Sequence, residues 1–116
     1  MRKEMEVMMV LELVESFIEA HTREDQKILA MVGAYAISHR GVAVVNIPSG
    51  RSYTVLSDDD TISLRTSRGV VYTFPIEQAK KFIAALGQYA NSDFADSKRR
   101  YTYKNKMVSA IAGWRK

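Results

Sequence analysis

The fold is decided by residues 42–74, VAVVNIPSGRSYTVLSDDDTISLRTSRGVVYTF, in which four short runs alternate with turn residues. The runs are rich in β-branched and aromatic residues, which favour strands. We expect the strands at Val42–Ile47, Arg51–Leu56, Thr61–Thr66 and Val70–Phe74. Between them stand Pro48-Ser49-Gly50, Asp58-Asp59-Asp60 and Ser67-Arg68-Gly69, which have the chemistry of tight turns. Residues 41–74 are therefore predicted to form a four-stranded antiparallel β-meander.

Alternation along these strands predicts which faces are buried. In the third strand, Ile62 and Leu64 lie on one side and Arg65 lies on the other. This pattern is typical of a sheet with one buried and one wet face. The first strand is apolar on both faces, so we expect another element, such as the helices that precede it, to cover it.

Two helices are predicted before the sheet, forming a helical hairpin over residues 1–40. The first runs from about Arg2 to His21, and its apolar residues cover more than half of the circumference. A helix covered from one side needs a narrower stripe, so we expect contacts from two directions. A homodimer through residues 5–37 would supply the second contact. Several methionines, Met1, Met5, Met8 and Met9, crowd the same helix.

The second helix is predicted from Thr22, a capping residue followed by acidic residues, to about Ser38. Its predicted apolar stripe is Ile28, Met31, Val32 and Tyr35. Beside the stripe, small side chains form a flank on which another backbone could approach closely: Ala30, Gly33 and Ala34.

The chain after the sheet is predicted to be largely helical. Pro75 suits the first position of a helix over residues 75–91, whose apolar residues recur at helical spacing. Residues 92–116 form either a helix over much of 93–114, or a strand at Arg99–Lys104 followed by a helix at Asn105–Gly113. The sequence therefore predicts an α+β protein, with residues 1–116 as a single domain.

Positive charge is concentrated at the C-terminal end. The chain has a formal net charge of +4, but residues 92–116 hold seven basic residues against Asp93 and Asp96. The basic residues are Lys98, Arg99, Arg100, Lys104, Lys106, Arg115 and Lys116. The remaining residues are nearly neutral, so this asymmetry predicts an anionic partner.

The predicted nucleic-acid-binding residues lie in this segment and on the sheet. Five cations would neutralise phosphates: Lys98, Arg99, Arg100, Lys104 and Lys106. Tyr101 and Tyr103, with Trp114 further on, would stack on unpaired bases. Arg51, Arg65 and Arg68 could form a cationic platform on the open face of the sheet. A solvated basic helix and an ordinary wet sheet face have the same compositions, so both interpretations stay open.

Other kinds of chemistry have little support in the sequence. The chain has no cysteine, and Asp58-Asp59-Asp60 lacks the alternate spacing and the glycine of a calcium loop, so we read it as a turn. His21 and His39 fall near helix ends without metal-like partners. We expect no enzymatic activity, catalytic residues, metal or cofactor. Glu12 and Glu15 interrupt the apolar run 7–18, which argues against an export signal or a membrane span and for a cytoplasmic location.

Three functions are compatible with these features. The first is a non-enzymatic protein that binds nucleic acid, DNA or RNA, through its C-terminal segment. The second is a protein-interaction module, such as an adaptor or the kind of host-complex inhibitor that small viral genomes encode, whose basic segment meets an acidic protein surface. The third is a structural subunit of a homo-oligomer.

Overall fold

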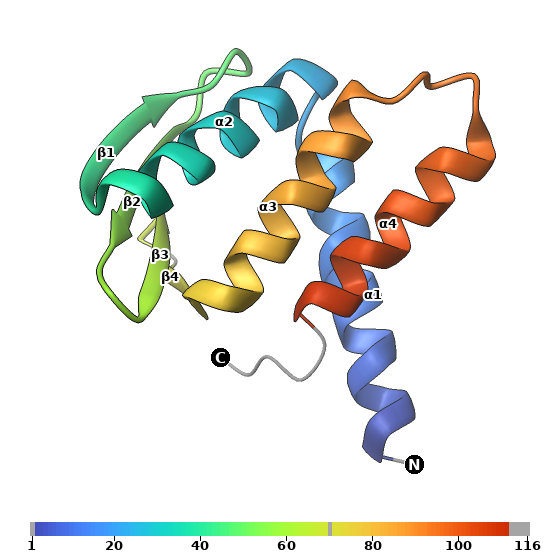
Figure 1. Ribbon diagram of the computed structural model, residues 1–116. Helices are drawn as coiled ribbons and strands as arrows, with labels where there is room; N and C mark the ends of the chain where they lie inside the picture. The colour runs from blue at the N-terminus through green and yellow to red at the C-terminus, as the bar shows by residue number, and fades with distance from the viewer. Residues whose placement is uncertain (1, 70, 112–116) are drawn as a thin grey trace.

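A computed structural model describes residues 2–69 and 71–111 of the chain, and the side chains from residue 10 onward within those ranges. It confirms the α+β class, with two helices, an antiparallel sheet and two further helices in chain order (Figure 1). The helices are α1 (Arg2–Ala20), α2 (Arg23–His39), α3 (Ile76–Asn91) and α4 (Ser97–Ile111). The strands are β1 (Gly41–Asn46), β2 (Ser52–Ser57), β3 (Thr61–Thr66) and β4 (Val71–Pro75).

The sheet is a meander in the order β1-β2-β3-β4, with every neighbouring pair antiparallel. The strand boundaries lie within one residue of those predicted from the turn chemistry, and Val70 lies outside the described residues. The turn interpretation of Asp58 is confirmed, because its Oδ1 accepts hydrogen bonds from the backbone amides of Asp60 and Thr61, both at 2.8 Å. The hydrogen bonds from these amides lower the pKa of Asp58 by more than burial raises it, so this pKa lies below its usual value.

Helices cover one face of the sheet and leave the other open. α2 and α3 lie side by side against the inner face, and α4 and α1 lie beyond α3 (Figure 1). α1 packs along α4, and its Phe17 ring meets Phe82 of α3 edge-on, with 6.0 Å between ring centroids. The described half of α1 is therefore contacted from more than one direction, as the width of its apolar arc predicts.

The core joins all of these layers. Its most deeply buried large side chains are Val14 of α1, Leu86 of α3, and Met107 and Ile111 of α4. A smaller cluster lies between the sheet and the two covering helices: Ala36, Val55, Ile62 and Ala79. Because α1 and α4 both supply core residues, these two helices are packed together.

The predicted apolar stripe of α2 is wrong at two positions. Met31 and Tyr35 are 71% and 59% exposed, and the buried face contains Leu29, Ala30, Gly33 and Ala36 instead. The reason is the neighbouring α3, which approaches the small residues closely. A methyl group added at Gly33 would lie 2.7 Å from Cδ1 of Ile83. The tight packing of α3 on this small surface fixes the rotation of α2 and turns Met31 and Tyr35 outward.

The expected covering of β1 by a helix of the hairpin is confirmed, but it extends to one face of the strand only. Val45 is buried under the helices, whereas Val42 and Val44 are 68% and 66% exposed on the open face of the sheet. α2 lies only on the inner face, and β1 is an edge strand. Strand alternation places Val42 and Val44 on the face that α2 does not reach.

The structure decides between the two interpretations of the C-terminal segment. Residues 97–111 form one continuous helix, α4, so the helical alternative is confirmed and the alternative strand at Arg99–Lys104 is not formed. Trp114, Arg115 and Lys116 lie outside the described residues.

Pro75 ends β4 and stands one residue before α3, so this helix begins one residue later than predicted. None of the helices, within their described residues, is long and apolar enough to cross a membrane.

Candidate nucleic-acid interface

The helical conformation of α4 separates the seven predicted residues of this segment into two groups. Lys98, Arg99, Tyr101 and Lys106 are exposed. Arg100, Tyr103 and Lys104 are half-buried on the side that faces the protein. The division follows from helical periodicity, because the inward group shares a face with the buried Met107, Ala110 and Ile111.

The inward group already has partners in the protein. Nζ of Lys104 lies 3.3 Å from Oε1 of Glu15 on α1. The guanidinium of Arg100 lies 5.3 Å from the centroid of the Phe94 ring, and Tyr103 packs against the core. These residues attach α4 to the body of the protein, which reduces their availability to an external ligand.

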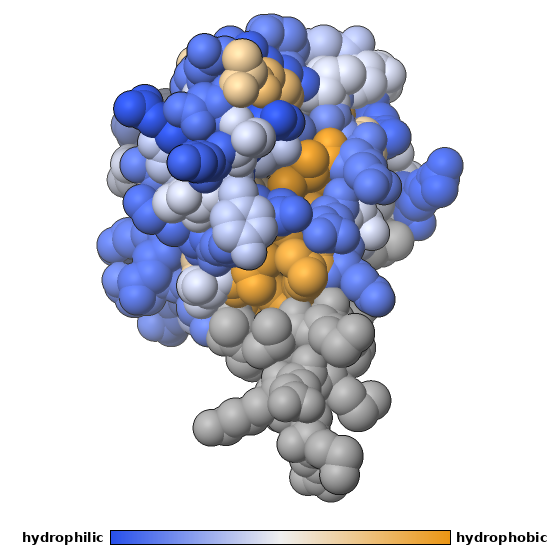
Figure 2. All heavy atoms as spheres, turned by 90° about the vertical axis from the view of Figure 1, so that its right-hand side faces the viewer, coloured by the Kyte–Doolittle hydropathy of each residue, from blue (hydrophilic) through white to orange (hydrophobic). Residues whose placement is uncertain are grey.

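The outward group faces solvent. Tyr101 is 64% exposed, with Nζ of Lys104 at 6.0 Å from its ring centroid. Arg99 forms an exposed ion pair with Asp96 at 3.3 Å, which solvent and salt weaken. The side of the molecule that carries α4 is mainly hydrophilic, with a hydrophobic band between the polar residues (Figure 2). The outward group thus gives this side two accessible kinds of contact, charge and an aromatic face.

An open groove of about 670 Å³ runs between α3 and α4. We call it the α3–α4 groove; it is lined by Lys81, Ala84, Ala85, Gln88, Tyr101, Thr102, Asn105, Lys106, Ser109 and Ala110. Alanines form its apolar part, while amide and hydroxyl groups can donate or accept hydrogen bonds. Its only ionisable lining residues, within the part of the chain that the structure describes, are Tyr101 and two lysines, Lys81 and Lys106. The exposed lining of the groove is therefore mainly apolar, and its two lysines favour an anion.

The predicted sheet arginines are not part of this surface. Arg65 is exposed on the open face of β3, and Arg68 is exposed in the turn that follows. The sheet and α4 lie on opposite sides of the molecule, with α2 and α3 between them (Figure 1). The structure thus separates Arg65 and Arg68 from the cations of α4.

Sequence reasoning missed the contribution of α3 to the groove. Lys81 and Gln88 stand seven residues apart, on the solvent side of the helix. On α4, Thr102, Asn105 and Ser109 follow the same helical periodicity. This spacing was visible in the sequence, but only the packing of α3 against α4 brings the two rows together.

A second polar cluster lies at the α1–α2 junction, which we define as residues 21–26. Asp25 is fully buried, accepts hydrogen bonds from the Ser49 amide at 3.1 Å and from the Ser49 hydroxyl, and completes a capping box with Thr22. Burial acts to raise the pKa of Asp25, but the hydrogen bonds from Ser49 and Thr22 prevail and hold it below its usual value. The cluster therefore stabilises a carboxylate inside the protein.

His21 and Arg23 of the junction also form hydrogen bonds within the protein. Nδ1 of His21 lies 2.8 Å from the Phe17 carbonyl oxygen, so this nitrogen donates and Nε2, 2.7 Å from Oη of Tyr53, accepts in the neutral ring. Nε of Arg23 donates to the Ala90 carbonyl at 2.7 Å and its Nη2 to the Ser92 carbonyl at 2.7 Å. His21 thus bonds a tyrosine and Ser49 bonds an aspartate, so the structure does not join His21 to a serine nucleophile.

His39 lies at the end of α2, where its Nδ1 is 3.1 Å from the Tyr35 carbonyl oxygen and its ring stacks on Tyr35. Among residues 2–69 and 71–111, no three histidine, aspartate or glutamate side chains are grouped in a way that could hold a metal ion. Comparison with protein-family models, curated proteins and solved structures finds no match to this chain.

Proposed function

We propose that this chain is a non-enzymatic nucleic-acid-binding protein that holds a DNA or RNA strand along the α3–α4 groove. The observation that carries the proposal is the pairing of Lys81 and Lys106 across the groove, beside the exposed ring of Tyr101. The two lysines come from different helices, so they would contact phosphates on both sides of the bound strand. Lys98 and Arg99 on the outward face of α4 extend the same positive surface.

Tyr101 favours a single strand over a duplex. An aromatic ring can stack on a base only where the base is not already stacked within a double helix. The amide and hydroxyl groups of Gln88, Thr102 and Asn105 would add hydrogen bonds to sugar or base edges. We therefore expect single-stranded DNA or RNA to bind more tightly than the matching duplex.

The first experiment is a fluorescence-anisotropy titration of the protein against single-stranded and double-stranded DNA and RNA at two salt concentrations. Binding through lysines weakens as salt rises, because it releases counterions from the phosphates. Salt-sensitive binding with a single-strand preference is the expected result. No binding even at low salt would contradict the proposal. It would indicate that the basic groove binds an acidic protein surface instead.

Matched charge variants then locate the interface. The double variant Lys81→Gln and Lys106→Gln removes two positive charges from the groove, and Arg65→Gln with Arg68→Gln removes two from the opposite side. For a single strand, loss of two phosphate contacts lowers the slope of log affinity against log salt by about 1.4. We expect this change in the groove variant alone. Equal losses in both variants would indicate attraction by net charge rather than by this groove.

A pair of tyrosine variants tests stacking. Tyr101→Ala removes the exposed ring beside the groove, and Tyr35→Ala removes a similarly exposed ring on α2. One lost base stack weakens binding by about 1–3 kcal/mol, an effect expected for Tyr101 and absent for Tyr35. Tyr101→Phe should keep most of the affinity, because it keeps the aromatic face. Unchanged binding by Tyr101→Ala would remove stacking from the proposal.

A further inference from the structure

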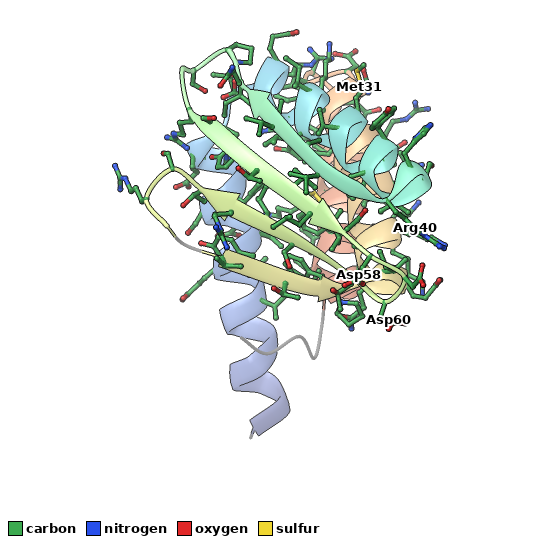
Figure 3. The ribbon with its side chains drawn as sticks, turned by 90° about the vertical axis from the view of Figure 1, so that its left-hand side faces the viewer. Met31, Arg40, Asp58 and Asp60 are labelled. Atoms are coloured by element: carbon green, nitrogen blue, oxygen red, sulfur yellow. The ribbon has the colours of Figure 1, made fainter. Side chains whose placement is uncertain are left out.

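β1 is an edge strand whose outer side meets no other strand among residues 2–69 and 71–111. Figure 3 looks onto the open face of the sheet, where β1 forms the edge next to α2, with Met31 on α2 and Arg40 at one end of the strand. On the open face, the edge carries Val42 and Val44, which are largely exposed. The free backbone groups of β1 therefore lie beside exposed apolar side chains.

The opposite side of the same edge is apolar as well. α2 covers the inner face of the sheet next to β1 and turns Met31 and Tyr35 toward solvent. Together Met31, Tyr35, Val42 and Val44 are four of the six large hydrophobic side chains that are exposed within the described residues. Four such side chains around one strand edge form a surface of the kind that proteins use for association.

β1 also lacks two of the features that normally prevent edge pairing, a charged residue and a proline. Its sequence, GVAVVN, has no charged residue and no proline. Arg40, which precedes it, forms an ion pair with Asp59 in the β2–β3 turn. The other edge strand, β4, ends in Pro75, which has no backbone donor. Because charges and proline are among the ways in which native sheets protect their edges, β1 is the less protected edge of this sheet.

The edge is complementary to itself. In an antiparallel pair, facing residues lie on the same face of the sheet, so two copies of β1 can meet about a two-fold axis at Ala43. Val42 of each copy then faces Val44 of the other on the open side, a β-branched cross-strand pair formed twice. Gly41 and Val45 face each other on the inner side, and no charged residue of β1 meets another charge.

We infer that two copies of this chain associate through their β1 edges to form a continuous eight-stranded antiparallel sheet. The backbone groups of β1 pair across the axis, and Met31 and Tyr35 of the two α2 helices are covered at the same interface. This surface shares only Met31 and Tyr35 with the homodimer expected through residues 5–37, because it uses β1 and leaves α1 out. It is also independent of the α3–α4 groove, which is lined by other residues.

The test is the mass of the full chain in solution over a wide concentration range, measured by sedimentation equilibrium. We expect a concentration-dependent species of twice the 13.1 kDa chain mass. Val44→Lys places a charge opposite Val42 of the second copy and should weaken dimerisation at least tenfold. Val71→Lys is the matched control, because Val71 is exposed on β4 and lies on the same open face at the other edge. Circular dichroism of both variants checks that they remain folded.

Cross-linking tests the register, since the natural chain has no cysteine. Under mild oxidation, a mixture of Val42→Cys and Val44→Cys proteins should form disulfide-linked heterodimers faster than either protein forms homodimers. A strict monomer at the highest concentration would overturn the inference and leave the edge to a strand of another protein. A dimer that Val44→Lys and Val71→Lys weaken equally would overturn it too, because the interface would then lie elsewhere.

Discussion

The α1–α2 junction and the α3–α4 groove both carry polar side chains, but those of the junction bond mainly within the protein and those of the groove face solvent. In the junction, Asp25 is fully buried and its oxygens accept hydrogen bonds from Thr22 and Ser49. In the groove, Lys81, Gln88 and Asn105 are exposed to solvent. The first cluster holds distant parts of the chain together, and the second presents charge outward.

This difference indicates where each cluster has its effect. Removing one partner from a buried hydrogen bond leaves the other partner without water, which destabilises the folded state. Removing an exposed lysine costs little stability, because solvent already screens its charge. Substitutions in the junction should therefore change the free energy of unfolding, and substitutions in the groove should change binding instead.

The largest expected effect is that of Asp25→Ala. It removes the acceptor of three hydrogen bonds, which come from the amide and hydroxyl of Ser49 and from the backbone amide of Thr22. We expect a loss of about 3 kcal/mol in the free energy of unfolding, measured by urea denaturation. Asp60→Ala, in an exposed turn, is the control and should change stability by about 0.5 kcal/mol or less. Equal effects of the two substitutions would contradict the comparison.

Part of that effect depends on pH. The folded-state pKa of Asp25 lies below its usual value, so the ionised form is favoured in the folded protein. The contribution of the Asp25 carboxylate to stability is complete above the unfolded-state pKa of 3.8. It is lost as the pH falls through the lower folded-state pKa. Asp25→Asn should therefore show a shallower loss of stability in acid than the parent, measured by urea denaturation between pH 2 and 6. If the free energy of unfolding falls with pH equally in the variant and the parent, Asp25 does not contribute to the loss of stability in acid.

Arg23→Ala is expected to have the next largest effect. It removes two hydrogen bonds to the carbonyls of Ala90 and Ser92 and the contact of the guanidinium with the Phe94 ring, 4.5 Å from its centroid. We expect a loss of about 2 kcal/mol in the free energy of unfolding. Arg68→Ala, in an exposed turn, should change stability little. Thermal unfolding of the two variants side by side distinguishes an anchor from a surface charge.

Thr22→Ala is expected to cost about 1 kcal/mol, the usual effect of removing a helix N-cap. The Thr22 hydroxyl accepts a hydrogen bond from the Asp25 amide at 3.1 Å. Thr22→Ser keeps this acceptor and should stay close to the parent in urea denaturation. If serine and alanine destabilise α2 equally, the capping bond does not carry the effect.

The smallest effect on stability is expected for the double variant Lys81→Gln and Lys106→Gln. Both side chains are exposed, so the free energy of unfolding should change by about 0.5 kcal/mol or less. The same variant should lose affinity for single-stranded nucleic acid. A large loss of stability would show that the groove lysines are structural. It would contradict the expectation that only substitutions in the junction change the free energy of unfolding.

The strands were predictable because local chemistry determines them. Turn residues such as Gly50 and Gly69, both at positive φ, separate runs of β-branched residues, and no tertiary contact is needed to read this pattern. Met31 and Tyr35 show where local reasoning fails. The periodicity of α2 allows either face to be buried, and the contact between Gly33 and Ile83 of α3 decides which.

The candidate site was predictable in part for the same reason. The cations of α4 are close together in the sequence, so their concentration is visible there. Their division into inward and outward groups depends on α4 being a helix, which Tyr101 and Tyr103 alone could not settle. Lys81 stands more than twenty residues from Lys106, and only the packing of α3 on α4 places both in one groove.

The pairing of α1 with α4 has a consequence for the order in which this protein folds during synthesis. Glu15 meets Lys104, so part of the packing surface of α1 is made 89 residues later in the chain. At ordinary rates of translation this interval lasts on the order of 10 s. During that time the apolar side of α1, with Val10 and Val14, is not yet covered by α4. The packing of α1 is thus completed only when α4 has been made.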